Sequence, residues 1–261
     1  MQNEHSSTVI RHSLPIAGVT DARLWGRGAR GVVYRANFAG RDVAVKVKFR
    51  ESRSTMALLR EARALELVNS WRVGPTLRYA DDTCVITDFV DGADIREWLP
   101  DARSTDVAAT FENLLEQAYR LDFLGRSKGE LHRLTNNLLI TDDNRPVLLD
   151  FERLVPAERP QNVTQIVHYL VVRQPLFAEL GICFDSNKAK ASAVAYKRAP
   201  SRRRFRELLD ALLAPDLVLP PAEARRRHGP RVARFRRRIP SRMKSHASNL
   251  ETLRRIARAQ H

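Results

Sequence analysis

The chain has 261 residues, of which 43% are hydrophobic, and its formal net charge is +15 at pH 7. This length suits two modest domains or a two-lobed enzyme, and no run of about 18 apolar residues is present that would span a membrane. Because the N-terminus also lacks the basic start and apolar core of a secretory signal, we expect a soluble, cytoplasmic protein without membrane insertion.

The N-terminal third predicts an antiparallel sheet with one helix. Apolar and polar residues alternate within 22–49, and a turn at Gly40 divides this stretch into strands. The apolar spacing then becomes helical, with residues three or four apart. The expected elements are three strands within 22–49, a helix at 54–68, and strands at 76–79 and 83–89.

The remainder of the chain is predicted to be mainly helical. A short helix is expected before Leu99, and Asp142 marks the turn of a small hairpin. The last helix carries one apolar stripe that includes Phe205 and Leu212. The longer elements are expected at 105–124 (helix), 138–141 and 146–150 (hairpin strands), and 162–172 and 202–213 (helices).

The two cysteines have neither the spacing of a metal site nor the number needed for a disulfide framework. This usage is typical of a reducing compartment. We therefore expect Cys84 and Cys183 to be core residues.

A Gly-x-Gly-x-x-Gly-x-Val sequence, formed by Gly26, Gly28, Gly31 and Val33, connects two predicted strands. Glycine lets a backbone turn approach phosphate oxygens closely and donate N–H groups to them. A turn that needs glycines for conformational reasons alone gives the same pattern. A strand follows these glycines, which argues against a dinucleotide-binding fold, because in that fold the glycines are followed by a helix.

Lys46 lies on a strand whose other side chains are apolar, and a buried lysine needs an anionic partner. Glu61 on the following predicted helix is the expected partner, with Glu51 and Glu66 as alternatives. A solvated lysine at a strand end is the other interpretation. An ion pair with Glu61 would orient the ammonium toward the α- and β-phosphates of a nucleotide.

Asp150 follows an apolar strand of the predicted hairpin, and Asn137 opens its partner strand. A carboxylate at this edge suits Mg²⁺, and the amide oxygen of Asn137 is the expected second metal ligand. Both residue types are also common turn caps. Their position on one hairpin, downstream of the glycines and of Lys46, favours metal binding.

The order and spacing of these motifs resemble those of the protein-kinase-like superfamily over residues 22 to about 172. Within it the chain is most similar to the compact atypical kinases: the RIO family, the KEOPS-complex kinase and their prokaryotic relatives. The resemblance implies a two-lobed α+β fold that binds ATP and Mg²⁺, in which the backbone from Asp88 to Val90 reads the adenine. The expected domains are an N-lobe at 1–90, a reduced helical C-lobe at 91–214 and an arginine-rich extension at 215–261.

The predicted catalytic loop departs from the family pattern. His132 stands five residues before Asn137, where these kinases have aspartate, and the nearest carboxylate is Glu130. The surrounding Gly-Glu-Leu-His sequence resembles the Gly-Asp-Leu-His of small-molecule phosphotransferases. Because glutamate reaches about one methylene further than aspartate, we expect Glu130 to be the catalytic base, with His132 as the alternative.

Two further departures bear on the phosphate acceptor. Glu152 follows Phe151 where many kinases have glycine, as in choline-kinase-like and aminoglycoside-kinase-like enzymes. Glu158 comes too soon after Asp150 to close a full activation segment. No platform for extended peptides is therefore expected, and a substrate presented by a large partner, or autophosphorylation, fits better.

The excess of basic residues is confined to the C-terminal part. Residues 1–196 hold 26 basic and 25 acidic side chains, whereas residues 197–261 hold 19 and 5. Clustered arginines attract nucleic-acid phosphates through counterion release, and the scarcity of aromatic residues favours backbone contact over base stacking. We expect RNA or DNA contact through residues 202–258; a solvated tail and an arginine-rich face on an acidic protein are the alternatives.

The leading hypothesis is an ATP- and Mg²⁺-dependent atypical serine/threonine protein kinase, autophosphorylating or acting as an ATPase. Lys46, Glu130 and Asp150 are its expected catalytic residues. A small-molecule phosphotransferase is the second hypothesis, and little chain is left to build its acceptor pocket. A pseudokinase that serves as a binding module in a ribonucleoprotein is the third.

Overall fold

The computed structural model describes residues 11–12, 14, 16–28, 31–48, 56–179 and 182–213, and for residues 11, 12 and 136 it describes the backbone alone. All of these residues belong to one compact unit, Met1–Leu219. The predicted extension at 215–261 and the predicted helix start at 54 lie outside the described residues. No helix in the described part of the chain is long and apolar enough to cross a membrane.

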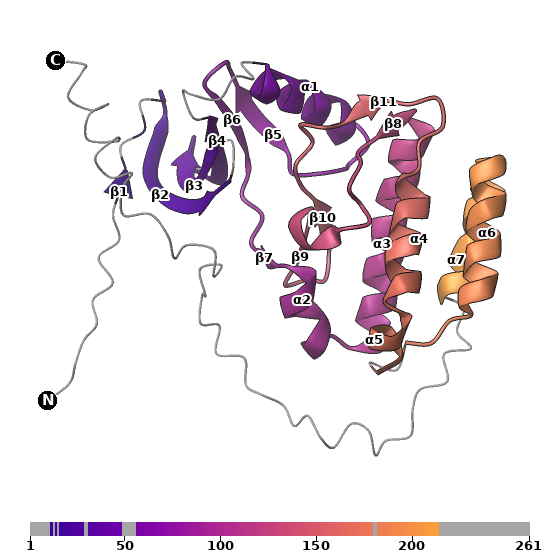
Figure 1. The fold of residues 1–261 in the computed structure, drawn as a ribbon. Helices are drawn as coiled ribbons and strands as arrows, with labels where there is room; N and C mark the ends of the chain where they lie inside the picture. Colours follow the sequence, from indigo (N-terminus) through magenta and orange to yellow (C-terminus); the bar gives the residue numbers. More distant parts are fainter. Residues whose placement is uncertain are drawn as a thin grey trace, which may run out of the picture. The chain divides into compact units, whose positions relative to one another are not determined.

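The N-terminal sheet has six strands in the order β1-β2-β3-β4-β6-β5, and each neighbouring pair is antiparallel. Figure 1 shows this sheet in indigo, with α1 beside β5 and β6. The bounds are β1 (Arg11–His12), β2 (Val19–Arg27), β3 (Gly31–Phe38), β4 (Arg41–Lys48), α1 (Ala57–Asn69), β5 (Leu77–Ala80) and β6 (Cys84–Asp88). The five predicted strands and the predicted helix are confirmed, and β1 is an additional short strand.

The alternation of side chains along β4 gives the sheet two different faces. Val43 and Val45 are fully buried and pack in a small core cluster with Ile86 of β6. Lys46, the next position, therefore points to the opposite face. α1 packs against that face through an apolar stripe that includes Leu65.

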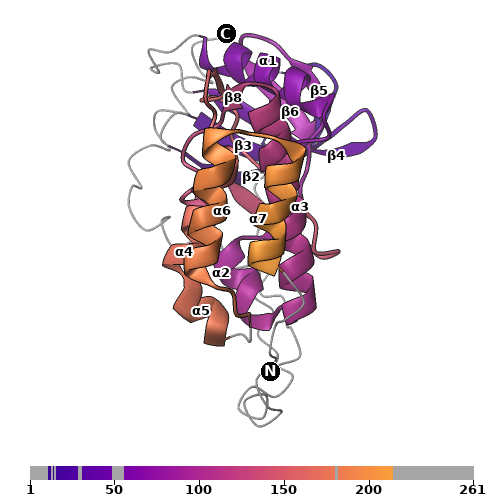
Figure 2. The ribbon, with the colours of Figure 1, turned by 90° about the vertical axis from the view of Figure 1, so that its right-hand side faces the viewer.

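The C-terminal part is mainly helical, as predicted. Figure 2 shows α3, α4, α6 and α7 side by side; α3 contacts α4 and α7, and α6 contacts the same two helices. The bounds are α2 (Ile95–Trp98), α3 (Ser104–Phe123), α4 (Asn162–Val172), α5 (Gln174–Glu179), α6 (Ser186–Arg198) and α7 (Arg202–Leu213), with 3-10 turns at Leu99–Asp101 and Leu134–Asn136. Together with the N-terminal sheet, these helices make an α+β fold.

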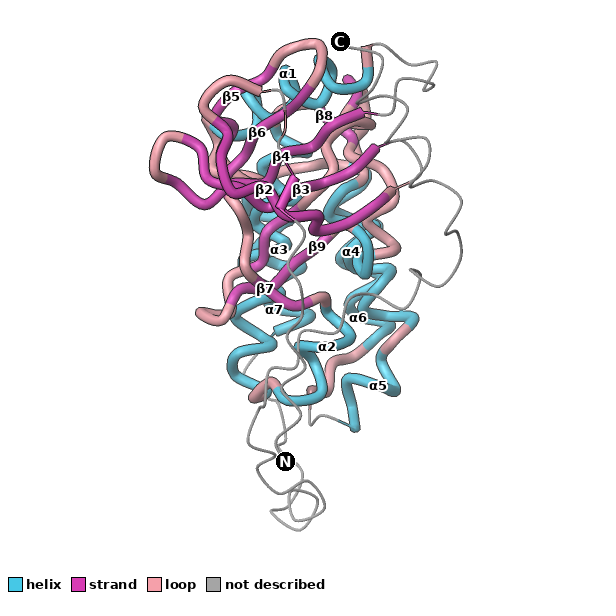
Figure 3. The backbone as a smooth tube through the Cα atoms, turned by 90° about the vertical axis from the view of Figure 1, so that its left-hand side faces the viewer, coloured by secondary structure: helices cyan, strands magenta, loops and turns pink. Residues whose placement is uncertain are grey.

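Two small sheets accompany these helices, one three-stranded with the order β10-β9-β7 and one pairing β11 with β8. All five strands are labelled in Figure 1, and Figure 3 shows β7, β8 and β9 from the side. Their bounds are β7 (Gly92–Ala93), β8 (Arg126–Ser127), β9 (Leu138–Thr141), β10 (Pro146–Leu148) and β11 (Val155–Pro156). The predicted hairpin is confirmed, with Leu138 opposite Leu148. This register puts Asn137 and Asp150 just beyond one end of the hairpin.

Two features of the C-terminal part differ from expectation. Cys183 is exposed, so the prediction that both cysteines are core residues is wrong, although Cys84 is buried. The helices α5 and α6 were not predicted. The predicted helix at 202–213 is confirmed as α7, so the first twelve residues of the predicted basic region 202–258 belong to this helix, which contacts α3 and α6.

The arginines at the start of α7 are paired with carboxylates. Arg202 binds Glu116 of α3, while Arg203 and Arg204 both lie within ion-pair distance of Glu207. These guanidiniums are therefore partly neutralised by the protein itself.

Candidate functional site

A cavity of about 380 Å³ opens between the N-terminal sheet, α1 and the β9–β10 hairpin. Eight of the residues predicted to form a nucleotide site line it: Gly26, Gly28, Val33, Lys46, Glu61, Asp88, Val90 and Asp150. Three other predicted site residues, Gly31, Glu130 and Asn137, do not belong to its lining. The structure therefore brings most of the predicted residues together around one cavity.

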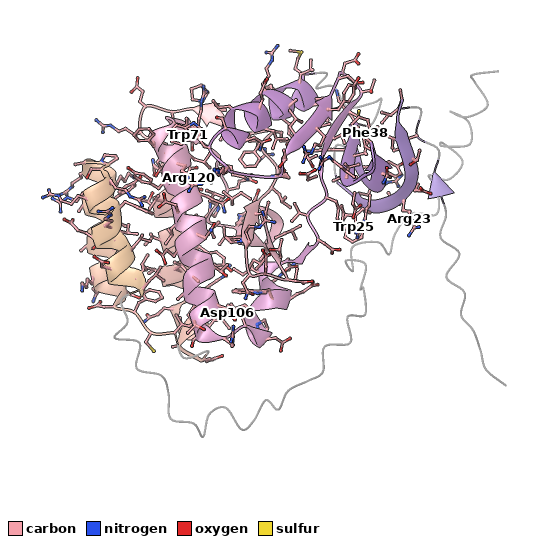
Figure 4. The ribbon with its side chains drawn as sticks, turned by 180° about the vertical axis from the view of Figure 1, so that it is seen from behind. Arg23, Trp25, Phe38, Trp71, Asp106 and Arg120 are labelled. Atoms are coloured by element: carbon pink, nitrogen blue, oxygen red, sulfur yellow. The ribbon has the colours of Figure 1, made fainter. Side chains whose placement is uncertain are left out.

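A second hollow, of about 570 Å³, lies along α3 and beside β10. Two of its charged residues bind the protein itself: Arg120 donates to the backbone oxygen of Trp71 and lies 3.8 Å from Glu116. Figure 4 shows Arg120 and Trp71 at one end of α3 and Asp106 toward the other. The larger hollow holds none of the predicted site residues, so the smaller cavity is the candidate site.

An ion pair between β4 and α1 lies in the cavity wall. Lys46 Nζ lies 2.6 Å from Glu61 Oε2 and 3.7 Å from Asp150 Oδ1. Glu61 occupies the buried stripe of α1, four residues before Leu65, so it faces the same side of the sheet as Lys46. The predicted pairing of Lys46 with Glu61 is confirmed.

Burial makes Glu61 unusual among the carboxylates of the site. Its residue is 6% exposed, and this desolvation raises the pKa of its carboxyl, while the charge and hydrogen bond of Lys46 act in the opposite direction. Asp150, by contrast, has a side chain that is 49% exposed. An incoming ligand therefore meets Asp150 and Lys46, while Glu61 holds Lys46 from behind.

The glycine-rich turn between β2 and β3 begins beside the cavity. Its ends are joined by a hydrogen bond of 2.9 Å from Gly28 N to the oxygen of Gly31. A Cβ on Gly31 would lie 2.3 Å from the backbone oxygen of Val47, so this position must be glycine for the strands to pair. Gly26 and Gly28 have no such neighbour, and the two residues at 29–30 lie outside the described residues.

The connection that follows β6 forms one edge of the cavity. The Asp88 carboxylate is bound by Arg78 through two hydrogen bonds of 2.6 Å, which lower its pKa, and Phe89 N donates to the oxygen of Asp42. Within the described residues the N–H of Val90 has no hydrogen-bond acceptor. A ligand at this edge can therefore be read through the backbone of Val90.

An aromatic pair covers the same edge. The rings of Trp25 and Phe89 meet edge to face with centroids 4.8 Å apart, and the Arg35 guanidinium lies 4.0 Å from the Phe89 centroid. Trp25, labelled in Figure 4, lies two residues before the end of β2 and is 45% exposed although it lines the cavity. This side chain offers a ring face to a flat ligand.

The loop before Leu131 has an uncommon backbone. Gly129 and Glu130 both have positive φ, 67° and 56°, and a side chain tolerates this conformation only at a cost of order 1 kcal/mol. The carboxylate of Glu130 forms an ion pair with Arg153, and both side chains are about half exposed. Glu130 is thus tied to the segment that follows Asp150 and lies outside the cavity wall.

Asn137 and Lys128 form a buried pair beside the hairpin. Lys128 Nζ donates to Asn137 Oδ1 at 3.0 Å, and its residue is 3% exposed. Burial lowers the pKa of Lys128 to about 8, against the opposing effect of Asp150 and Glu130. The amide oxygen that was predicted to be a metal ligand therefore already accepts a hydrogen bond from an ammonium.

The carboxylates of the site suit a hard cation. Glu61, Asp150 and Glu152 each have an oxygen within 4.8 Å of the others. Mg²⁺ prefers such oxygens, and it usually takes one or two carboxylates together with phosphate oxygens. Because Glu61 is bound to Lys46 and Glu152 is almost buried, Asp150 is the carboxylate best placed to share a metal with a phosphate.

A buried polar network, which sequence reasoning missed, holds the loop in place. Asn162, at the start of α4, accepts from Lys128 N at 2.9 Å and donates to Asp122 of α3 and to the oxygen of Arg126. Asp122 also accepts from the hydroxyl of Tyr196 in α6. The available signal was an asparagine at the first position of a helix that has a buried apolar face.

A scan against protein-family models and a search of curated proteins both gave no match to this chain.

Proposed function

We propose that the chain is an ATP- and Mg²⁺-dependent phosphotransferase with a reduced protein-kinase-like fold. The observation that carries this proposal is the arrangement around Lys46, whose ammonium lies 2.6 Å from Glu61 and 3.7 Å from Asp150 in the wall of the cavity. A lysine held by a buried glutamate, next to a half-exposed aspartate, supplies positive charge for phosphates and one ligand for a metal.

The cavity suggests how the nucleotide lies. In the proposed position, the adenine of the nucleotide lies between Trp25 and the backbone of Val90. The N–H of Val90 has no acceptor among the described residues. The phosphates then extend past Gly28 toward Lys46 and Asp150, which line the same cavity. Mg²⁺, when bound at Asp150, would neutralise charge on the phosphates.

Glu130 is the residue we propose for orienting the acceptor hydroxyl. Its carboxylate is ion-paired with Arg153, so it must exchange this partner for the hydroxyl before it can accept a proton. The proposed acceptor is a seryl or threonyl hydroxyl, on this chain or on a protein partner.

The test is incubation of the purified protein with Mg-ATP. ADP release is measured, and phosphate incorporation is measured by intact mass. We expect the wild type to release ADP or to gain one or more phosphates of about 80 Da each. Asp150→Ala should abolish both, because phosphoryl transfer depends chiefly on charge neutralisation and positioning. Asp142→Ala, which removes an exposed carboxylate from the β9–β10 turn, is the matched control and should keep full activity.

A nucleotide-binding module without turnover is the second candidate, and the ion pair between Glu130 and Arg153 favours it. Glu130→Gln distinguishes the two. If Glu130 orients the acceptor, this variant keeps nucleotide binding and loses transfer by about 100-fold or more. If the wild type binds Mg-ATP but neither transfers nor hydrolyses it, the binding module is the better description and the phosphotransferase proposal is wrong.

A further inference from the structure

Lys128 is a buried cation that the proposed function does not use. Its residue is 3% exposed, and its backbone N–H is fixed by the side chain of Asn162. Its ammonium lies 5.4 Å from the ring centroid of Phe151, the neighbour of Asp150. Phe151 and Asp150 line the cavity and Lys128 does not, so its ammonium lies just behind the cavity wall.

The orientation of the Asn137 amide is set by two hydrogen bonds. Asn137 Nδ2 donates to the backbone oxygen of Arg133 at 3.2 Å, and Asn137 Oδ1 accepts from Lys128 at 3.0 Å. A rotated amide would direct its NH₂ group at an ammonium, so the oxygen must face Lys128. This oxygen is the atom predicted to be the second metal ligand. In protein kinases the asparagine of the catalytic loop holds a second Mg²⁺ in this way, so a second ion on Asn137 is the arrangement to compare with.

A divalent ion on Asn137 Oδ1 would lie next to the Lys128 ammonium. The two cations would repel each other strongly, because little bulk water lies between them to screen the charges. Asp150, whose negative charge acts on the Lys128 ammonium, can offset one of these cations by binding it. An ammonium has three N–H donors, and within the described residues only one of those of Lys128 has an acceptor, Asn137.

We propose that Lys128 takes the place of a second metal ion: its ammonium, held by Asn137, binds the terminal phosphate of the nucleotide, and the chain uses a single Mg²⁺ on Asp150. This inference rests on the proposed nucleotide site. Asn137 is then a positioning residue for Lys128 and not a metal ligand.

The experiment counts metal ions directly. Mn²⁺ is titrated into the full-length protein saturated with a non-hydrolysable ATP analogue, and the free ion is measured by electron paramagnetic resonance. We expect one Mn²⁺ per protein–nucleotide complex in the wild type and still one in Asn137→Ala. In Lys128→Met, which keeps a long apolar side chain and removes the charge, we expect a second Mn²⁺ and an at least tenfold weaker affinity for the ATP analogue.

The control is Lys190→Met on the exposed surface of α6, which should match the wild type in both measurements. Two Mn²⁺ ions in the wild type, with loss of one in Asn137→Ala, would overturn the inference and leave the nucleotide site intact. An unchanged affinity and count in folded Lys128→Met would overturn it equally. A wild type that binds no nucleotide overturns the proposed function, and this inference with it.

Discussion

The Lys46 ammonium lies between two carboxylates, those of Glu61 and Asp150, and in the proposed function it also binds a nucleotide phosphate. Replacing it by methionine removes the charge that the phosphates would bind, and a charged hydrogen bond contributes about 1.5–3 kcal/mol. We therefore expect Lys46→Met to weaken Mg-ATP binding by about 10- to 150-fold, measured by isothermal titration calorimetry. Stability should fall by a smaller amount, because Glu61, whose pKa burial already raises, can take up a proton when its partner is lost.

Lys190→Met is again a suitable control, since it removes an exposed lysine of α6 far along the chain from β4. Its affinity for Mg-ATP should equal that of the wild type. If Lys46→Met bound Mg-ATP within threefold of the wild type, Lys46 would be a structural partner of Glu61 alone, and the proposed path of the phosphates would be wrong.

Trp25 provides a spectroscopic test of the proposed adenine position. Its ring lines the cavity and is 45% exposed, so stacking of a base on it should change its emission. We expect ATP to quench the intrinsic fluorescence of the wild type and of Trp71→Phe to the same extent. Trp25→Phe should lose the quenching while keeping most of the affinity; quenching that survives in this variant would place the base elsewhere.

At the scale of single residues, sequence reasoning found the side chains whose position follows from local periodicity. Lys46 is on the cavity face because its neighbour Val45 is in the core, and Glu61 shares a helical stripe with Leu65. The partners of Lys128 and Glu130 could not be predicted in this way. Each contact joins loop residues whose approach depends on backbone angles, such as the positive φ at 129 and 130.

At the scale of the secondary-structure elements, a buried polar network joins α3, α4 and α6. Asn162 links the loop at Lys128 N, the carboxylate of Asp122 and the oxygen of Arg126, and it is completely buried. Asn162→Ala leaves these buried groups short of a partner, at a cost of about 1–3 kcal/mol for each. We expect the free energy of unfolding to fall by about 3 kcal/mol or more, measured by urea denaturation.

The matched control for this prediction is Asn113→Ala in α3. Asn113 is exposed, and its one described contact is to Gln117, which also donates to the oxygen of Pro146. Its loss should cost less than about 1 kcal/mol. Equal effects of the two substitutions would mean that the buried network does not hold the helices together.

The turn between β5 and β6 gives a prediction of pH dependence. Burial raises the pKa of Asp81, but hydrogen bonds from Thr83, Cys84 and Tyr79 outweigh it and lower the pKa to about 2. Because this pKa lies below its ordinary value of 3.8, the contribution to stability is complete above about pH 4 and is lost as the pH falls toward 2.

Asp81→Asn should therefore be less stable than the wild type by about 1 kcal/mol at pH 7, the difference between charged and neutral hydrogen bonds. Urea unfolding at several pH values checks this. The gap between the two proteins should be constant from pH 7 to pH 5 and should narrow below about pH 4. A gap that widens in acid would show that the Asp81 carboxylate does not hold the turn.

Among the elements, those with strong periodicity were predicted almost to the residue, and those without it were missed. α4 and α7 have one clear apolar face, and their bounds match the prediction. α6 buries chiefly Ala189 and Tyr196, which is too weak a stripe to stand out from its lysines and alanines. Its best local signal was Asp185, whose side chain caps the helix by accepting from Asn187 N.

At the scale of the whole molecule, the arginine runs of the C-terminal part fall into two groups, according to whether acidic residues lie beside them. Those at the start of α7, Arg202 to Arg204, already lie beside Glu116 and Glu207. The runs at 225–227 and 236–238 have few acidic residues near them in the sequence. We propose that contact with RNA or DNA phosphates depends on the later runs.

This proposal predicts different salt dependences for two triple substitutions of equal size. Each phosphate contact on a single strand contributes about 0.7 to the slope of log K against log salt. Replacing residues 225–227 with glutamine should therefore reduce the magnitude of the slope for a 20-nucleotide RNA by up to about 2. The same replacement at 202–204 removes guanidiniums that carboxylates already partly neutralise, so its slope should change by less than about 0.5. Both slopes come from fluorescence anisotropy titrations between 50 and 200 mM salt, with thermal unfolding as the check that α7 still packs. If the two variants lose equal amounts of slope, the ion pairs of α7 open to bind nucleic acid. If neither loses any, the run at 225–227 makes no phosphate contact and the proposal is wrong for that run.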